Sequence, residues 1–149
     1  MSRFHSGTFC NSGWVLQKYS TRSPDSNLIV YPLGSQPAGM LIYGEEKMSV
    51  ILCKHPLNDG SQPISSFPDE VPPGIPGVDY LFYTGAYECD ADNEIVTHHL
   101  ESCCIPEWIN TRQQRHISLY GNFLQLQTVT PVILEGQEQH ASLVWKRLF

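Results

Sequence analysis

Short runs of β-prone residues recur along this chain at intervals of roughly ten residues, separated by Gly, Asn, Asp and Pro. The hydrophobic residues do not keep the period of a helix over any long stretch. The runs cover residues 13–19, 27–31, 39–43, 48–53, two hairpins within 80–128, and 141–147. Residues 44–47 predict a tight turn between two of these runs. The pattern predicts an all-β chain of about eight strands.

A chain of about eight consecutive strands with one apolar face is typical of a lipocalin-like up-and-down antiparallel β-barrel. The interior of such a barrel is wide enough for one small ligand. A β-sandwich is the alternative arrangement of the same strands. The chain has 149 residues, so we expect a single domain, residues 1–149, with one hydrophobic core.

The two hairpins within residues 80–128 can be aligned from their own polar and apolar pattern. If residues 90–93 form the first loop, the facing pairs are Tyr87 with Val96, Gly85 with His98, and Tyr83 with Leu100. If Gly121-Asn122 forms the second turn, the pairs are Leu119 with Leu124, Ile117 with Leu126, and Arg115 with Thr128. In the first alignment, the glycine leaves space beside the imidazole of His98.

His98 and Arg115 take positions on strand faces that are otherwise apolar, so we expect both side chains to point into the barrel. A histidine titrates in the range that suits a general acid or base; a core histidine bonded to a strand neighbour is the structural alternative. Arg115 would bind a carboxylate, enolate or phenolate oxygen, or form a buried ion pair with Glu88, Asp90 or Glu101.

Aromatic and aliphatic residues on the same faces are expected to line the cavity. Apart from His98 and Arg115, the predicted lining is Leu41, Tyr43, Val50, Tyr83, Tyr87, Leu100, Trp108, Ile117 and Leu126. The tyrosines would donate phenolic protons or stack on a flat ligand, and Tyr87 is assigned a catalytic role. Packing between strands is their structural alternative. Trp14 and Trp145 are expected to pack the closed end.

Charge and composition exclude several classes of function. The formal net charge is −6 and the longest cationic run is Lys146-Arg147, which argues against nucleic acid as a partner. No apolar run approaches the length of a membrane span, and the first residues lack an apolar signal segment, so we expect a soluble, cytoplasmic protein. The five cysteines, an odd number, are expected to be free thiols.

We expect neither a metal nor a cofactor. His99, Glu101 and Cys103 share a strand face, but Thr97 lies on it too and no second ligand pair follows at a recognisable spacing. The glycine patterns that bind phosphates and dinucleotides are missing, as is the Gly-x-Ser-x-Gly elbow of hydrolases. Any enzyme here would work without a recognisable cofactor.

Residues 55–78 are rich in Pro, Gly, Ser and Asp and cannot form a central strand. A long connection within a compact domain is either a functional lid over a site or a mobile segment. This segment is therefore a candidate lid.

Several short motifs follow one another at residues 13–16, 39–43, 48–49, 83–87 (Tyr-x-Gly-x-Tyr), 97–102, 106–108 (Pro-x-Trp), 114–115 (Gln-Arg) and 143–147. In this order they resemble the small lipocalin-like domain family of bacteria and fungi, over nearly the whole chain. The resemblance implies a barrel with a central cavity and places His98, Trp108 and Arg115 at motif positions. Members encoded in natural-product gene clusters are similar to cofactor-free cyclases and isomerases.

The leading hypothesis is a cofactor-independent isomerase or cyclase that acts on a small, apolar, oxygen-bearing natural-product intermediate, polyketide-like or terpenoid-like. The cavity would fold the substrate, His98 would move a proton, and Arg115 with a tyrosine would hold an oxygen. The rival hypothesis is a non-catalytic carrier or sensor of lipophilic small molecules. A third is a structural barrel that binds a partner.

Overall fold

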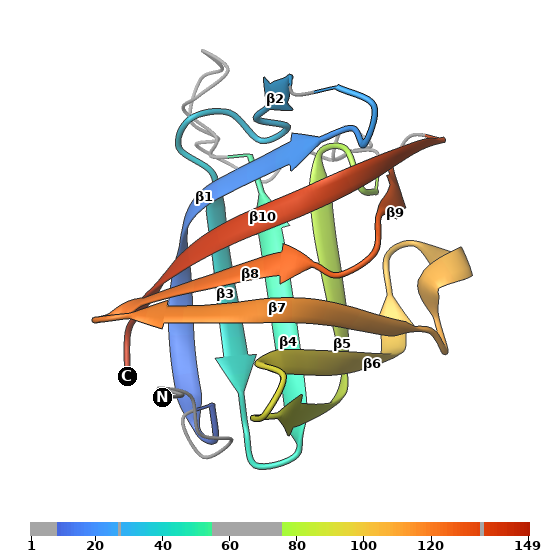
Figure 1. The fold of residues 1–149 in the computed structure, drawn as a ribbon. Helices are drawn as coiled ribbons and strands as arrows, with labels where there is room; N and C mark the ends of the chain where they lie inside the picture. The colour runs from blue at the N-terminus through green and yellow to red at the C-terminus, as the bar shows by residue number, and fades with distance from the viewer. Residues whose placement is uncertain (1–8, 27, 55–75, 135) are drawn as a thin grey trace, which may run out of the picture.

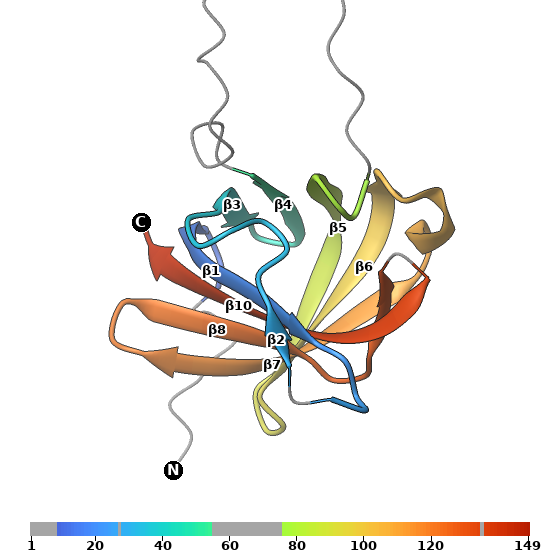
Figure 2. The ribbon, with the colours of Figure 1, turned by 90° about the horizontal axis from the view of Figure 1, so that it is seen from above.

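Eight long strands form a closed antiparallel barrel in the computed structural model, which describes residues 9–26, 28–54, 76–134 and 136–149. The strands are β1 (Ser12–Arg22), β3 (Ala38–Tyr43), β4 (Lys47–Cys53), β5 (Tyr80–Asp90), β6 (Ile95–Cys103), β7 (Arg112–Tyr120), β8 (Phe123–Thr128) and β10 (Gln137–Arg147). They follow in sequence order around the barrel, and β1 pairs with β10 to close it (Figures 1 and 2). The predicted all-β up-and-down barrel is confirmed.

Two short strands and one short helix accompany the barrel within the described ranges. β2 (Ile29–Val30) pairs with β1, and β9 (Val132–Leu134) pairs with β10. The helix η2 (Pro106–Trp108) lies between β6 and β7. Among the described residues of the strand predicted at 27–31, only Ile29 and Val30 form a strand, and β9 was not predicted. No helix in the described part is long and apolar enough to cross a membrane.

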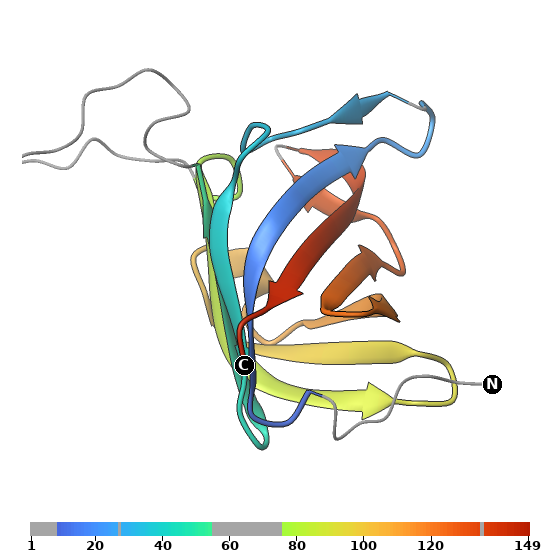
Figure 3. The same cartoon turned by 90° about the vertical axis from the view of Figure 1, so that its left-hand side faces the viewer.

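β1 changes its buried face partway along the strand. Leu16 pairs with Trp145, whereas Lys18 pairs with Val144, so Gln17 is an extra residue in the ladder. The buried side chains of the strand are Ser12, Trp14 and Leu16 before this bulge, and Tyr19 and Thr21 after it. A bulge increases the local twist and bends a strand. Figure 3 shows the resulting curvature of β1 beside β10.

The register predicted for the second hairpin is confirmed. β7 and β8 pair Leu119 with Leu124, Ile117 with Leu126, and Arg115 with Thr128, around the turn Gly121-Asn122. Gly121 has φ +62°, the left-handed conformation that this two-residue turn requires. The alternation buries Arg115 and Ile117 and exposes Gln114, His116 and Ser118, so Arg115 is directed into the barrel.

The register predicted for the first hairpin is wrong by two residues. Tyr87 pairs with His98 and Gly85 with Leu100, because the loop runs from residue 91 to 94. Beyond Gly85, Thr84 pairs with Ser102, which leaves residue 101 as a bulge on β6. A Cβ on Gly85 would overlap the carbonyl oxygen of His99. The glycine therefore makes room for the backbone of β6, not for the imidazole of His98.

The barrel interior is filled mainly by large side chains. Among the largest fully buried residues are Phe9, Trp14, Leu41, Tyr43, Leu100 and Trp145. Phe9 stacks on Tyr43 with ring centroids 4.6 Å apart and meets Trp14 edge-on. All five cysteines lie in the described ranges and are free thiols, as predicted. The candidate lid, residues 55–78, falls outside the described residues except for its last three positions.

Candidate functional site

A small cavity inside the barrel is lined by residues of seven strands. The lining is Leu41, Val50, Leu52, Leu81, Tyr83, His98, Arg115, Leu126, Leu143 and Trp145. Its volume is about 40 Å³, space for a few water molecules at most. Ligand pockets have volumes of roughly 300–1,000 Å³. The interior is thus narrower than the barrel topology predicts, because large aromatic and aliphatic side chains fill it.

The structure brings together only part of the predicted lining. Leu41, Val50, Tyr83, His98, Arg115 and Leu126 line the cavity. Tyr43, Leu100 and Ile117 are buried in the core beside it without lining it. Trp108 lies in η2 and packs half-buried against the core. Tyr87 is half-buried, and its hydroxyl donates to the carbonyl oxygen of Gly44, so it contributes no group to the cavity.

Four lining residues were not among the predicted site residues: Leu52, Leu81, Leu143 and Trp145. Strand alternation contains the signal for three of them. Leu52 shares a face with Val50 on β4, Leu81 shares one with Tyr83 on β5, and Leu143 is two residues from Trp145 on β10. Trp145 was expected at the closed end, and a pattern of apolar residues alone does not show which level of the barrel a strand position occupies.

His98 lies between two tyrosine hydroxyls in the barrel interior. Its Nε2 is 2.6 Å from the hydroxyl of Tyr43, and its Nδ1 is 2.7 Å from the hydroxyl of Tyr83. Burial, together with the positive charge of Arg115, lowers the pKa of His98 from 6.5 to about 3. The imidazole is therefore neutral at physiological pH. A neutral imidazole has one donor and one acceptor nitrogen, so one tyrosine donates to the ring and the other accepts from it.

The two tyrosines keep their protons through the neutral range. Burial raises the pKa of Tyr43 well above 10 and also raises that of Tyr83. The charge of Arg115 acts in the opposite direction on both hydroxyls, but it is the smaller effect. Tyr43, His98 and Tyr83 thus form a neutral hydrogen-bonded chain that reaches the cavity at Tyr83.

Arg115 is 8% exposed, and its Nη1 donates to the carbonyl oxygen of Gln114 at 2.9 Å. The carboxylates considered as its partners are engaged elsewhere: Glu88 with His99, Glu101 with Lys47, and Asp90 with Asn93. No ion pair joins Arg115 to a carboxylate within the described ranges. The barrel interior therefore contains a guanidinium charge that no described acid neutralises.

A wider groove lies at the barrel end where β1 meets β2 and where β9 meets β10. It has a volume of about 400 Å³, and its lining includes Tyr19, Thr21, Val30, Leu134 and Gln139. We call it the mouth groove. Tyr19 pairs across strands with Leu143, which lines the inner cavity. The charge of Arg115 also lowers the pKa of Tyr19, although burial has the larger effect and raises it to about 12. Tyr19 thus lies between the mouth groove and the inner cavity.

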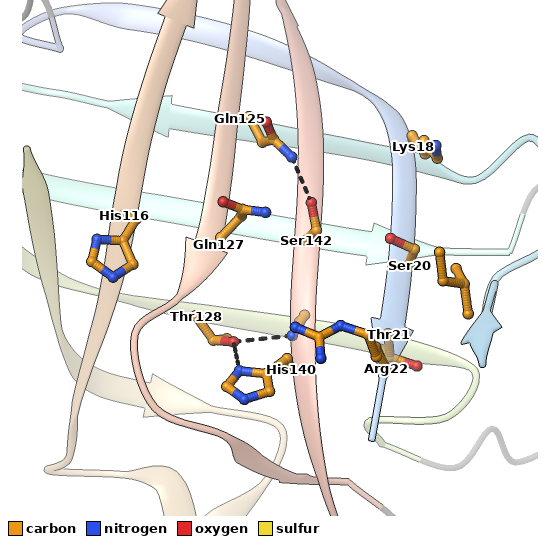
Figure 4. A pocket seen from close by; sticks show the side chains of 12 residues that line it. Lys18, Ser20, Thr21, Arg22, His116, Gln125, Gln127, Thr128, His140 and Ser142 are labelled. Carbon is orange, nitrogen blue, oxygen red and sulfur yellow. Dashed lines mark hydrogen bonds between the residues drawn. The ribbon is translucent and has the colours of Figure 1, made fainter. Parts of the chain in front are cut away.

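Another groove lies on the outside of the barrel, across β1, β7, β8 and β10 (Figure 4). Its volume is about 440 Å³, and its side chains are mostly polar: Lys18, Ser20, Arg22, His116, Gln125, Gln127, His140 and Ser142. Gln125 donates to Ser142 across the two strands, as Figure 4 shows. This surface lacks the apolar lining expected around a small lipophilic molecule.

The geometry defines a closed antiparallel barrel with a mostly apolar inner cavity and a few directed polar groups, the architecture of proteins that enclose small ligands. The lipocalin-like domain family matches residues 13–148, and the chain belongs to this family. It is 29% identical over 99 residues to the 4′-hydroxy-3′-methoxypropiophenone carrier protein ppsC of Aspergillus oryzae. That alignment covers 62% of this chain and 87% of the relative. No solved structure matches the chain.

Proposed function

We propose that this protein binds a small, largely apolar, oxygen-bearing molecule inside its barrel and carries it without changing it. One observation supports this most directly: Arg115 is a buried charge that lines an otherwise mostly apolar cavity and has no described carboxylate partner. Burying an unpaired charge is unfavourable, so a ligand oxygen that accepts its hydrogen bonds would be bound strongly. The similarity to a named carrier of an aromatic ketone supports the same reading.

The ligand would enter through the mouth groove. The groove has the volume of a small-ligand pocket, whereas the inner cavity does not. Rotation of Tyr19 would join the two spaces, because Tyr19 lines the groove and pairs with Leu143 of the inner lining. An apolar body would then occupy the groove while its oxygen reaches Arg115.

The state of His98 favours carriage over acid–base catalysis. Both ring nitrogens already have tyrosine partners, and the pKa near 3 keeps the ring uncharged. A general base needs a free lone pair, and a general acid at neutral pH needs a pKa closer to 7. His98 then acts as a positioning residue that orients the hydroxyl of Tyr83.

The second candidate is a cofactor-independent isomerase or cyclase of polyketide-like or terpenoid-like intermediates. The hydroxyl of Tyr83, held by His98 at the cavity wall, favours it, because this hydroxyl can give its proton to one substrate atom while it takes up the proton that another substrate atom loses, and no buried ion remains. An isomerisation needs no net proton, since the proton removed from one substrate atom returns to another. Arg115 would hold the oxygen on which negative charge develops.

The experiment is a titration of the full chain with 4′-hydroxy-3′-methoxypropiophenone by equilibrium dialysis. We expect saturable binding of one molecule per chain and recovery of the ketone unchanged. Val50→Phe places a larger side chain in the cavity and should weaken binding at least tenfold, whereas Ile51→Phe, on the outer face of the same strand, should not. Absence of saturable binding, or equal binding by both variants, would overturn the proposal.

Exchange of the ketone's α-hydrogens in D2O separates the two candidates. A carrier leaves the exchange rate of the bound ketone at or below that of the free ketone. An isomerase that works through an enolate accelerates exchange, and Tyr83→Phe removes that acceleration. Accelerated exchange would replace the carrier with the second candidate.

A further inference from the structure

Two buried tryptophans of the barrel differ in one respect. Trp14 and Trp145 are each 1% exposed, but only Trp14 has a partner for its indole N–H, the hydroxyl of Ser12 at 2.9 Å. The Nε1 of Trp145 is buried and has no hydrogen-bond acceptor in the described structure. Buried polar groups are nearly always hydrogen-bonded, so an unmatched donor calls for an explanation. Trp145 lines the inner cavity.

Arg115, which carries a buried positive charge, lines the same cavity. A third donor is Tyr83: when His98 donates its Nδ1 hydrogen to the oxygen of Tyr83, the hydroxyl hydrogen of Tyr83 is left to donate elsewhere. Tyr43 then donates to Nε2 of His98, so the chain runs in one direction towards the cavity. Three side chains on three strands, each with a hydrogen-bond donor, thus line one small cavity.

No described carboxylate neutralises the positive charge of Arg115 at this cavity. The charge of Arg115 affects the pKa of four buried side chains in the barrel: Tyr19 on β1, Tyr43 on β3, Tyr83 on β5 and His98 on β6. Cys89 raises the pKa of Tyr43, and Cys103 raises that of Tyr83. All of these except Arg115 are neutral at pH 7, so the cavity has a positive potential. Such a cavity favours the ionised form of an acidic ligand.

We propose that Arg115, Trp145 and Tyr83 form a subsite for a single oxygen anion, so that the ligand is a small phenol held as its phenolate. This inference rests on the proposed function and adds the ionisation state and chemical class of the ligand. The leucines that surround the donors favour one charged oxygen over a carboxylate, whose second oxygen would be desolvated among Leu126 and Leu143.

The test uses 4-nitrophenol, whose phenolate absorbs at a longer wavelength than its neutral form. With the full chain in excess, we expect the apparent pKa of the bound phenol to fall by at least one unit below that of the free phenol. 4-Nitroanisole, which cannot ionise, should bind at least tenfold more weakly at a pH where the phenol is ionised. Benzoate should bind more weakly than the phenolate; equal binding would overturn the assignment to a single oxygen.

Trp145→Phe removes the indole N–H that has no acceptor and should reverse a measurable part of the pKa shift of the phenol. Trp14→Phe removes the indole N–H that is bonded to Ser12 and should leave the pKa shift unchanged. If Trp145→Phe does not fold, the indole N–H resonance of Trp145 in the unaltered protein gives the answer. It should move downfield when 4-nitrophenol binds, and that of Trp14 should not.

The outcomes separate the two proposals. Failure of both 4-nitrophenol and the aromatic ketone to bind would overturn the proposed function. Binding of the phenol with an unchanged pKa, and with the Trp145 resonance unmoved, would overturn only the oxyanion subsite.

Discussion

The hydroxyl of Tyr43 lies 2.6 Å from Nε2 of His98, and this contact joins β3 to β6 across the barrel. The two strands are separated in the sheet by β4 and β5. A buried polar contact between strands that do not pair fixes the distance between two parts of the barrel wall. The hydrogen bond between Tyr43 and His98 should contribute to the stability of the fold, because loss of the Tyr43 hydroxyl would leave a buried ring nitrogen without a partner.

Removing the hydroxyl should therefore destabilise the fold. Tyr43→Phe keeps the ring that stacks on Phe9 and is expected to lower the free energy of unfolding by about 1–3 kcal/mol, measured by urea denaturation. Tyr120→Phe, on the outer face of β7, should change it by less than about 0.5 kcal/mol. Equal effects of the two substitutions would show that the contact with His98 contributes nothing.

The low pKa of His98 predicts a specific pH dependence of stability. In the unfolded chain the imidazole binds a proton below about pH 6.5, but in the folded barrel only below about pH 3. The unfolded state therefore binds the extra proton between these values, and the free energy of unfolding should fall by about 1.4 kcal/mol per pH unit as the pH decreases. In His98→Gln this contribution should vanish, and an unchanged slope would contradict the assignment.

Gly85 is expected to tolerate no side chain. Gly85→Ala would place a Cβ against the carbonyl of His99 at the bulge of β6, and the backbone cannot move aside cheaply. We expect a loss of about 3 kcal/mol or more in the free energy of unfolding. Gly44→Ala, where the nearest atom to the added Cβ is 3.3 Å away, is the matched control and should cost clearly less. Similar losses in both variants would refute the role of the bulge.

Arg115→Met should separate stability from binding. The substitution removes a buried charge that has no described carboxylate partner and substitutes an apolar side chain, so stability should rise or change by less than about 1 kcal/mol. Affinity for an ionisable phenol should fall at least tenfold, as measured by dialysis. Arg112→Met, on the exposed face of the same strand, should alter neither. A large loss of stability in Arg115→Met would mean that the arginine has a structural partner.

The sequence predicted the β7–β8 hairpin fully, because Gly121-Asn122 allows one tight turn and the alternation excludes a slip by one residue. The β5–β6 hairpin lacked such a constraint. Its loop runs over residues 91–94 and ends on Glu94, which has a left-handed conformation. A glycine at this position would have indicated that conformation in the sequence, but the residue is a glutamate. A shift by two residues preserves the inward and outward faces, so the burial of His98 was predicted although its partner was not.

The site was predictable only as a set of inward positions. Strand alternation placed His98 and Arg115 in the interior, and both are buried there. It could not show that two tyrosines occupy both nitrogens of His98, or that Trp145 has an unmatched donor while Trp14 does not. Those contacts depend on the height of each residue along the barrel axis. Strand tilt and bulges set this height, whereas strand alternation sets only whether a side chain points inward or outward.

The pairing of β1 with β10 has a consequence for how the protein acquires its site. Trp14 pairs with Arg147, so closure joins positions near opposite ends of the barrel sequence. Contacts between such distant positions form slowly, because the chain between them must first be ordered. Leu143 and Trp145 lie on β10 and complete the wall of the cavity. On the ribosome, the nascent chain therefore cannot enclose a ligand until β10 has emerged, so ligand uptake must follow the synthesis of this strand.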